Sequence, residues 1–160
     1  MIEVWDPDDF SMPESLGFET ITETDLFELV EKETWALSME FSRDGAKLAI
    51  YGRDRKLRLF NVYTGKLMKI FDETLAVYQG YTSQPTDSMV YLTKESLEKK
   101  LVVEKQLEDV WDSELVTPEA LPNVQFSESG EYIVFGCMLG LKILNIETNK
   151  LVRILGKDEQ

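Results

Sequence analysis

Residues 39–71 read MEFSRDGAKLAIYGRDRKLRLFNVYTGKLMKIF, and residues 124–155 repeat the pattern as VQFSESGEYIVFGCMLGLKILNIETNKLVRIL. The copies align at a Phe-Ser step, at a glycine, at a second glycine with one residue of slippage, and then without gaps over six residues. The aligned positions are Phe41-Ser42 with Phe126-Ser127, Gly45 with Gly130, Gly52 with Gly136, and 57–62 with 141–146. Because self-similarity at a fixed spacing is typical of repeat architectures, the chain is predicted to contain one structural unit twice.

Each copy is predicted to form four short strands separated by turns. Asp and Ser side chains hydrogen-bond to the nearby backbone and Gly accepts positive φ, so these residues mark the turns. Apolar, β-prone runs lie between them, and residues 57–60 nearly alternate. The residues assigned to turns are Asp44, Gly45, Gly52, Asp54, Gly65, Gly130 and Gly136, with Asn149 standing where the first copy has Gly65. Four antiparallel strands in about 35 to 45 residues is the size of a β-propeller blade.

Between the copies, residues 87–111 contain neither Pro nor Gly, and apolar residues recur with helical spacing. The pattern predicts an amphipathic helix of about 20 residues, with Thr86-Asp87 as its N-cap. Two roles stay open for it: packing against the side of the strands, or acting as an insertion that presents a docking face. Upstream of the first copy, the sequence predicts strands over 1–5 and 17–22 and a short helix over 25–32, capped by Thr24 or Asp25.

The composition excludes several kinds of active site. The chain has 160 residues, 17 Lys and Arg, 30 Asp and Glu, no His and a formal net charge of -13. Without His it has no Ser-His-Asp triad, no Cys-His dyad and no His-ligated metal site. The single cysteine, Cys137, lies in an apolar run, and we expect a small core residue in a reducing compartment. No apolar run reaches about 20 residues and the acidic start lacks a positive region, so neither a membrane span nor a signal peptide is expected.

Charge is unevenly distributed along the chain. Residues 1–40 carry 12 acids and one base, whereas residues 41–71 carry 2 acids and 8 bases. One interpretation is that these bases are solvated strand and turn residues that complement their acidic neighbours. The other is an anion-facing patch for a partner, formed by Arg53, Arg55, Lys56 and Arg58, of which at least two would be exposed together. Since the overall charge opposes nucleic acid, we expect the partner to be a protein.

The motifs carry a family resemblance. The strings FSRDG, YGRDRKLRLF and YTGKL are similar to a WD40 repeat, in which a Phe-Ser-Pro-Asp-Gly-like turn precedes a Gly-x-x-Asp turn. The order of MIEVW, TETDL, DRK, TGKLM, FDE, MLGLK and VRILGK resembles the WD-repeat-containing peptidylprolyl isomerases, which are spliceosome-associated nuclear cyclophilins. The resemblance covers essentially the whole chain. It implies a mainly β fold: a partial WD40-type propeller of about two four-stranded blades with an amphipathic helical insertion between them.

The organisation implied by this resemblance divides the chain into four parts. Residues 1–36 would be the end of a preceding blade and its connection, 37–72 a blade, 86–112 the helical insertion, and 123–156 a second blade. Each blade of a propeller buries its faces only against neighbouring blades. Two blades therefore need further blades or self-association, and we expect either an internal piece of a longer protein or a truncated gene model.

The sequence departs from the family pattern at two points. WD40 blades often join a His, a Ser or Thr, an Asp and a Trp in one hydrogen-bonded network, of which only Asp54 stands here, with Phe60-Asn61 and Leu144-Asn145 in the place of Trp-Asp. We therefore expect these blades to rely on apolar packing more than on a buried polar network. The family's isomerase domain also needs a catalytic Arg beside a Phe-His step, and a chain without His lacks that step.

The leading functional expectation is a non-catalytic, nuclear protein-interaction scaffold that holds protein partners in a pre-mRNA splicing assembly, without cofactor, metal or membrane. The alternative is a fragment of a peptidyl-prolyl cis-trans isomerase whose activity lies in a domain outside this chain. A third hypothesis is a carboxylate enzyme or Ca²⁺ binder built on Asp6, Asp8 and Asp9. That segment lacks the glycine and the distal bidentate Glu of an EF-hand, so a solvated acidic linker is the favoured interpretation.

Overall fold

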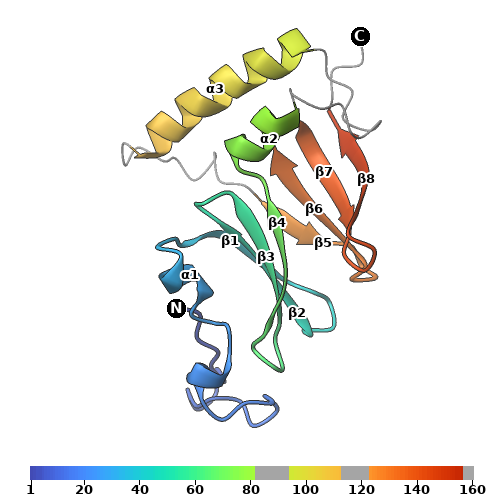
Figure 1. The fold of residues 1–160 in the computed structure, drawn as a ribbon. Coiled ribbons are helices and arrows are strands. Elements are labelled where there is room, and N and C mark those ends of the chain that lie inside the picture. The colour runs from blue at the N-terminus through green and yellow to red at the C-terminus, as the bar shows by residue number, and fades with distance from the viewer. Residues whose placement is uncertain (82–93, 113–122, 157–160) are drawn as a thin grey trace.

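The computed structural model describes residues 1–81, 94–112 and 123–156. The fold is mainly β, with two four-stranded antiparallel sheets and few helices (Figure 1). The elements are η1 (Ile21–Glu23), α1 (Glu28–Glu31), β1 (Ala36–Phe41), β2 (Lys47–Gly52), β3 (Lys56–Asn61), β4 (Leu67–Asp72), α2 (Leu75–Tyr81), α3 (Lys94–Asp112), β5 (Val124–Phe126), β6 (Tyr132–Cys137), β7 (Gly140–Asn145) and β8 (Lys150–Leu155). No helix in the described ranges is long and apolar enough to cross a membrane.

Each sequence repeat forms one sheet, with its strands paired in chain order. Sheet A has the order β1-β2-β3-β4 and sheet B the order β5-β6-β7-β8. The four strands predicted for each copy are confirmed. The turns also follow the expected chemistry: Gly45 and Gly130 both have φ of 70°, and Gly65 and Asn149 have φ of 62° and 56°. These are left-handed conformations that Gly and Asn adopt readily.

The strand pairing corrects the alignment of the second glycines. Ala49 pairs with Leu59 as Val134 pairs with Ile143, so β2 and β6 correspond with an offset of 85 residues. Gly52 is therefore equivalent to Cys137 rather than to Gly136. The assignment of Gly52 and Gly136 to turns is wrong, because both glycines lie within strands. The slippage falls in the next turn, which is one residue shorter in the second copy.

The N-terminal segment differs from its prediction. Residues 1–5 and 17–22 form no strands; instead η1 spans Ile21–Glu23. Thr24 donates a side-chain hydrogen bond to the carbonyl of Ile21 at 2.6 Å, a local bond of the kind that competes with sheet formation. The predicted short helix exists only as α1, and its N-cap is Phe27, not Thr24 or Asp25. The Asp25 carboxylate instead accepts the backbone N–H of Leu67 at 2.8 Å, at the start of β4.

The long helix between the repeats is present from residue 94. Helix α3 confirms the predicted amphipathic helix over 94–111, whereas its predicted start and the Thr86-Asp87 cap lie outside the described residues. The sequence did not indicate the short helix α2, which directly follows β4. Figure 1 shows α2 lying between α3 and the sheets. A small core joins them: Tyr78 of α2, Leu97 of α3 and Leu139 of the β6–β7 turn are buried together.

The two sheets stack so that unlike faces meet. Each sheet has two sides, which we call its front face and its back face. The front face is formed by Leu48, Ile50, Arg58 and Phe60 in sheet A and by Ile133, Phe135, Lys142 and Leu144 in sheet B. The back face is then the opposite side, formed in sheet A by Ala49, Tyr51, Leu57 and Leu59 and in sheet B by Val134, Gly136, Leu141 and Ile143.

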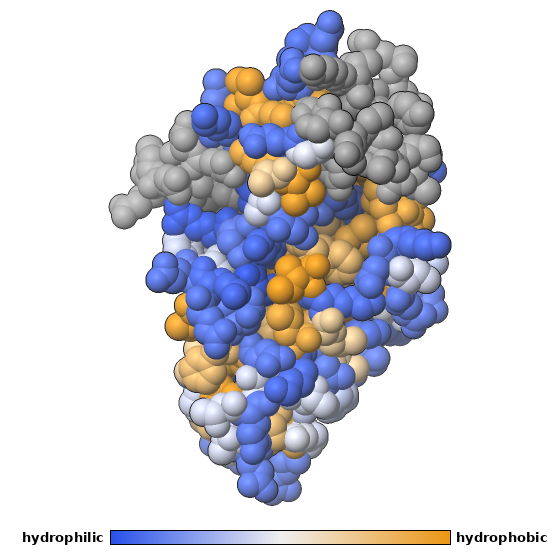
Figure 2. Space-filling view, viewed as in Figure 1, coloured by the Kyte–Doolittle hydropathy of each residue, from blue (hydrophilic) through white to orange (hydrophobic). Residues whose placement is uncertain are grey.

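The back face of sheet A packs on the front face of sheet B. The apolar residues of both these faces belong to one buried core, in which the Tyr51 and Phe135 rings lie 6.1 Å apart. The front face of sheet A is covered by Phe18, Leu26 and Leu29 of the N-terminal segment. On the back face of sheet B, Leu141 is 50% exposed. Figure 2 shows apolar side chains at the surface over β7 and β8.

Candidate functional site

The predicted basic patch is divided between the surface and the interior. Arg53 and Lys56 are partly exposed, and the Arg53 guanidinium lies 4.4 Å from the centre of the Trp35 ring. Lys56 forms a salt bridge with Asp72 at 3.8 Å. Arg55 and Arg58 are buried, so only Arg53 and Lys56 of the four candidate residues reach the surface. The charges of Arg55 and Arg58 are used inside the protein.

Arg58 lies in a carboxylate network on the front face of sheet A. Its two terminal nitrogens bond to the two Asp54 oxygens at 2.9 and 2.6 Å, and its Nε lies 3.5 Å from a Glu28 oxygen on α1. The hydrogen bond that Arg58 donates to Asp54 is the main cause that raises the pKa of Arg58. The Asp54 backbone N–H donates to the Thr34 hydroxyl at 3.1 Å. Asp54 therefore takes part in a partly buried polar network with Arg58 and Thr34, in addition to the apolar packing expected for this sheet.

Arg55 attaches the helical segment to the β2–β3 turn. The residue has φ of 58°, and its side chain bonds to a Glu104 oxygen of α3 at 2.8 Å. The same guanidinium reaches the Glu104 carbonyl at 3.4 Å. Its own carbonyl accepts the backbone N–H of Glu73 at 2.9 Å. Both partners are largely excluded from solvent, with 7% and 19% of their side chains exposed. The interpretation that the helix packs against the strands is thus supported for this face of α3.

Lys142 occupies in sheet B the position that Arg58 has in sheet A. Its Nζ lies 2.6 and 2.8 Å from the two Glu73 oxygens and 3.3 Å from the Tyr78 hydroxyl, which itself donates to Glu73. Only 4% of the Glu73 side chain is exposed. Burial is the main cause that raises the pKa of Tyr78, and burial likewise raises the pKa of the partly buried thiol of Cys137.

The two buried cations make equivalent joints between successive units. Arg58 forms a salt bridge at 3.5 Å with Glu28 of the segment that precedes sheet A, and Lys142 forms one at 2.6 Å with Glu73 of the segment that precedes sheet B. A buried charge requires such a partner, since an unpaired one carries a large desolvation penalty. The sequence does indicate these two residues, because Arg58 and Lys142 are cations at the same position of two apolar strands, Leu-Arg-Leu-Phe-Asn and Leu-Lys-Ile-Leu-Asn. Their inward orientation was missed because alternation alone leaves the buried side of such a strand open.

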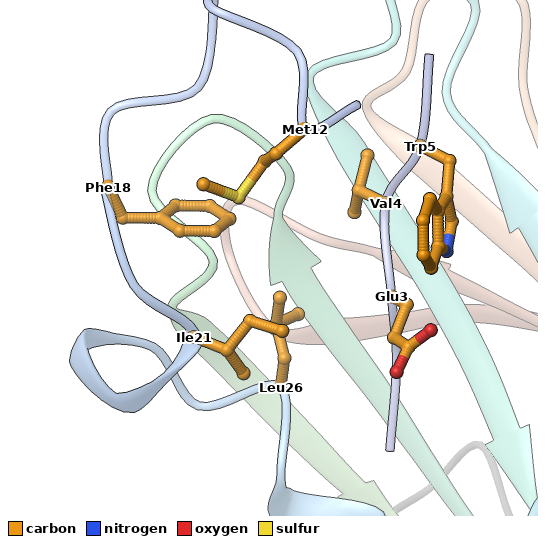
Figure 3. Close-up of a pocket in the computed structure, with 7 residues that line it drawn as sticks. All are labelled: Glu3, Val4, Trp5, Met12, Phe18, Ile21 and Leu26. Carbon is orange, nitrogen blue, oxygen red and sulfur yellow. The ribbon is translucent and has the colours of Figure 1, made fainter. Parts of the chain in front are cut away.

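An apolar pocket of about 190 Å³ lies apart from these joints, in the N-terminal segment. Figure 3 shows its walls, with Met12, Phe18, Ile21 and Leu26 facing the extended segment 3–5. Nearby, the proposed cation loop is closed by hydrogen bonds of its own. Asp6 accepts the N–H of Asp8 at 2.9 Å, and Asp9 accepts both the N–H and the hydroxyl of Ser11. Within the described ranges no three His, Cys, Asp or Glu residues are grouped as metal ligands.

The chain is similar in sequence to several known proteins. No family model matches it. It is 38% identical over 161 aligned residues to the peptidylprolyl isomerase domain and WD repeat-containing protein 1 of mouse, and equally identical to that of human. It is 35% identical to peptidyl-prolyl cis-trans isomerase CYP71 of Arabidopsis thaliana.

Its homologues are named as peptidyl-prolyl isomerase proteins. Some of these names also include WD repeats. Each alignment covers 99% of this chain, but only 23% of the mouse and human proteins and 24% of the plant protein. The chain therefore spans about a quarter of the length of these relatives.

Proposed function

We propose that this chain is a non-catalytic protein-interaction scaffold, built as part of a WD40-type propeller and acting in a nuclear pre-mRNA splicing assembly. The observation that carries the proposal is the stacking of the two repeats. The back face of the first sheet meets the front face of the second, and equivalent cations, Arg58 and Lys142, each form a salt bridge with a carboxylate of the preceding segment. Such a head-to-tail contact repeats in the same direction, as successive blades of a propeller do.

The surfaces left open by this stacking support further units on both sides. Val134, Gly136, Leu141 and Ile143 of sheet B are equivalent to the four residues that sheet A buries against sheet B. On the front face of sheet A, the N-terminal segment covers the middle strands, whereas Met39 of β1 and Ile70 of β4 remain 59% and 45% exposed. Relatives several times longer than this chain are in keeping with additional sheets.

The splicing role, the nuclear location and the protein partners rest on the resemblance described above. Arg53 and Lys56 remain the candidates for partner contact from the original basic patch, because both are partly exposed. The alternative function, a fragment of a peptidyl-prolyl isomerase with its activity elsewhere, is favoured by the names of the homologues. The two proposals are compatible, and both place catalysis outside this chain.

Two measurements test the scaffold. The tagged chain is incubated in nuclear extract and recovered, and spliceosomal small nuclear RNAs are quantified; we expect enrichment of about tenfold or more over the tag alone. The double variant Arg53→Glu, Lys56→Glu should reduce recovery several-fold, whereas Lys150→Glu, at an exposed position of β8, should not. Recovery equal to the tag alone would exclude the splicing role.

Catalysis is tested separately with the purified chain and a proline-containing peptide. We expect isomerisation at the uncatalysed rate, on a timescale of tens to hundreds of seconds at 25 °C. Acceleration proportional to the concentration of the chain would contradict the non-catalytic proposal. The longer relatives, measured in the same assay, provide the positive control.

A further inference from the structure

The pocket of the N-terminal segment is large enough for one apolar side chain. Its volume of about 190 Å³ exceeds the roughly 150 Å³ of an engineered protein cavity that holds benzene. Six of its seven lining residues are apolar, and the seventh is Glu3. Trp5 and Met12 are 58% and 38% exposed, so the walls reach the surface. This geometry suits an aliphatic or aromatic side chain that enters from solvent.

Backbone hydrogen bonds hold two walls of the pocket in place. The N–H of Ile2 donates to the carbonyl of Leu26 at 3.1 Å, which fixes the extended start of the chain against the opposite wall. The loop between Trp5 and Met12 is closed by the N–H of Asp6 donating to the Ser11 carbonyl at 2.8 Å. A ligand would therefore meet a formed pocket, which lowers the ordering cost of binding.

Acidic side chains outnumber cations around the pocket, where the nearest cation is Lys66, 3.4 Å from Asp25 and beside the lining residue Leu26. No Lys or Arg occurs in residues 1–31, which contain ten Asp and Glu residues. Glu3 lines the pocket itself, and the exposed carboxylates Asp8 and Asp9 lie in the loop between two lining residues. Glu19 and Glu23 are also exposed and follow the lining residues Phe18 and Ile21 within two positions. An apolar pocket surrounded in this way selects for a cationic ligand.

We infer that this pocket binds a basic peptide segment in which one Leu, Ile, Met or Phe side chain is flanked by Lys or Arg. The apolar side chain fills the pocket, and the flanking cations lie near Glu3, Asp8 and Asp9. Burial of the apolar side chain provides the affinity, whereas the acidic surroundings speed association and reject acidic partners. This inference deepens the scaffold proposal, and it rests on that proposal only for the premise that the chain binds proteins.

Calorimetric titration of the chain with synthetic peptides tests the inference. The probe is an acetylated, amidated heptapeptide with six lysines and a central leucine; one control has serine in place of the leucine, and another has glutamates in place of the lysines. We expect the serine peptide to bind at least tenfold more weakly and the glutamate peptide not to bind. Raising the salt from 50 to 300 mM should weaken the leucine peptide several-fold, as expected for partly screened charges. Equal binding of the leucine and serine peptides, or no binding of either, would overturn the inference.

Variants of the chain locate the binding site. Met12→Lys places a cation in the pocket wall and should weaken the leucine peptide at least tenfold. Phe10→Ser is the matched control, because Phe10 is 73% exposed in the same loop and does not line the pocket. A circular dichroism spectrum like that of the parent chain verifies that each variant is folded. Equal loss in both variants, or in neither, would show that the peptide binds elsewhere.

Failure of the peptide experiment leaves the recovery of small nuclear RNAs unchanged. The two proposals can therefore fail independently.

Discussion

Removing the Lys142 ammonium should destabilise the protein strongly. In the folded chain its Nζ lies 2.6 Å from a Glu73 oxygen, and only 4% of the Glu73 side chain is exposed. Lys142→Met keeps the apolar stem but leaves a buried carboxylate without its cation. Loss of one partner of a buried ion pair typically costs about 3 to 5 kcal/mol, because the remaining charge keeps its desolvation penalty. That is a large part of a typical unfolding free energy of roughly 5 to 15 kcal/mol.

A double-mutant cycle separates this penalty from a simple loss of packing. Glu73→Gln in the Lys142→Met background removes the stranded charge, so it should recover about half or more of the loss. Each variant is unfolded in urea and followed by tryptophan fluorescence, with the free energy of unfolding obtained by linear extrapolation. Lys150→Met, at an exposed position, is the control and should change stability by about 0.5 kcal/mol or less. A loss below about 1 kcal/mol for Lys142→Met, or no recovery in the double variant, would refute the buried joint.

Three further predictions address other parts of the fold. Gly140→Ala should lower the free energy of unfolding by about 2 kcal/mol or more, because φ is 128° and a Cβ would lie 2.2 Å from a backbone oxygen. Gly80→Ala, in helix α2, places its Cβ in open space and should raise that free energy by up to about 1 kcal/mol in the same urea assay. Burial raises the pKa of Tyr78 above the unfolded value of 10.0, so above pH 10 the folded state keeps a proton that the unfolded state loses. The free energy of unfolding should therefore be unaffected below pH 10 and should fall above it by at most about 1.4 kcal/mol per pH unit. Tyr78→Phe should remove that part of the slope, and an unchanged slope would contradict the buried hydroxyl. Arg55→Ala should detach α3 and speed its amide hydrogen exchange at least tenfold, with Glu104→Ala giving the same pattern; faster exchange throughout both sheets instead would indicate global unfolding.

Local patterns in the sequence account for the strands, the turns and the long helix. The near-alternation of Leu57 to Phe60 and the left-handed turns at Gly45 and Gly130 depend on neighbouring residues, and the structure confirms them. Helix α3 likewise follows from helix formers at regular spacing. The prediction of strands over 1–5 and 17–22 was wrong because a β-prone segment forms a strand only when another strand pairs with it.

The candidate site depends on contacts between distant parts of the chain, which is why the sequence predicted it only in part. Arg55 bonds to Glu104, which lies 49 residues further along the chain, and Lys142 bonds to Glu73, which lies 69 residues earlier. Neither separation leaves a local signal. By contrast, the Asp54–Arg58 pair spans four residues across one turn, and its charge pattern was visible. The basic residues were predicted as one group, and their surroundings decide which of them face solvent.

The unequal coverage of the two outer faces limits how copies of this chain could assemble. A head-to-tail contact that never closes produces a filament, since each new copy offers the same free end. Here the back face of sheet B is open, whereas Phe18, Leu26 and Leu29 already occupy much of the front face that it would have to meet in the next copy. Growth by the repeat contact would therefore require the N-terminal segment to move off the front face. Two copies could still join through their open back faces, which would give a closed, two-fold symmetric dimer rather than a fibre.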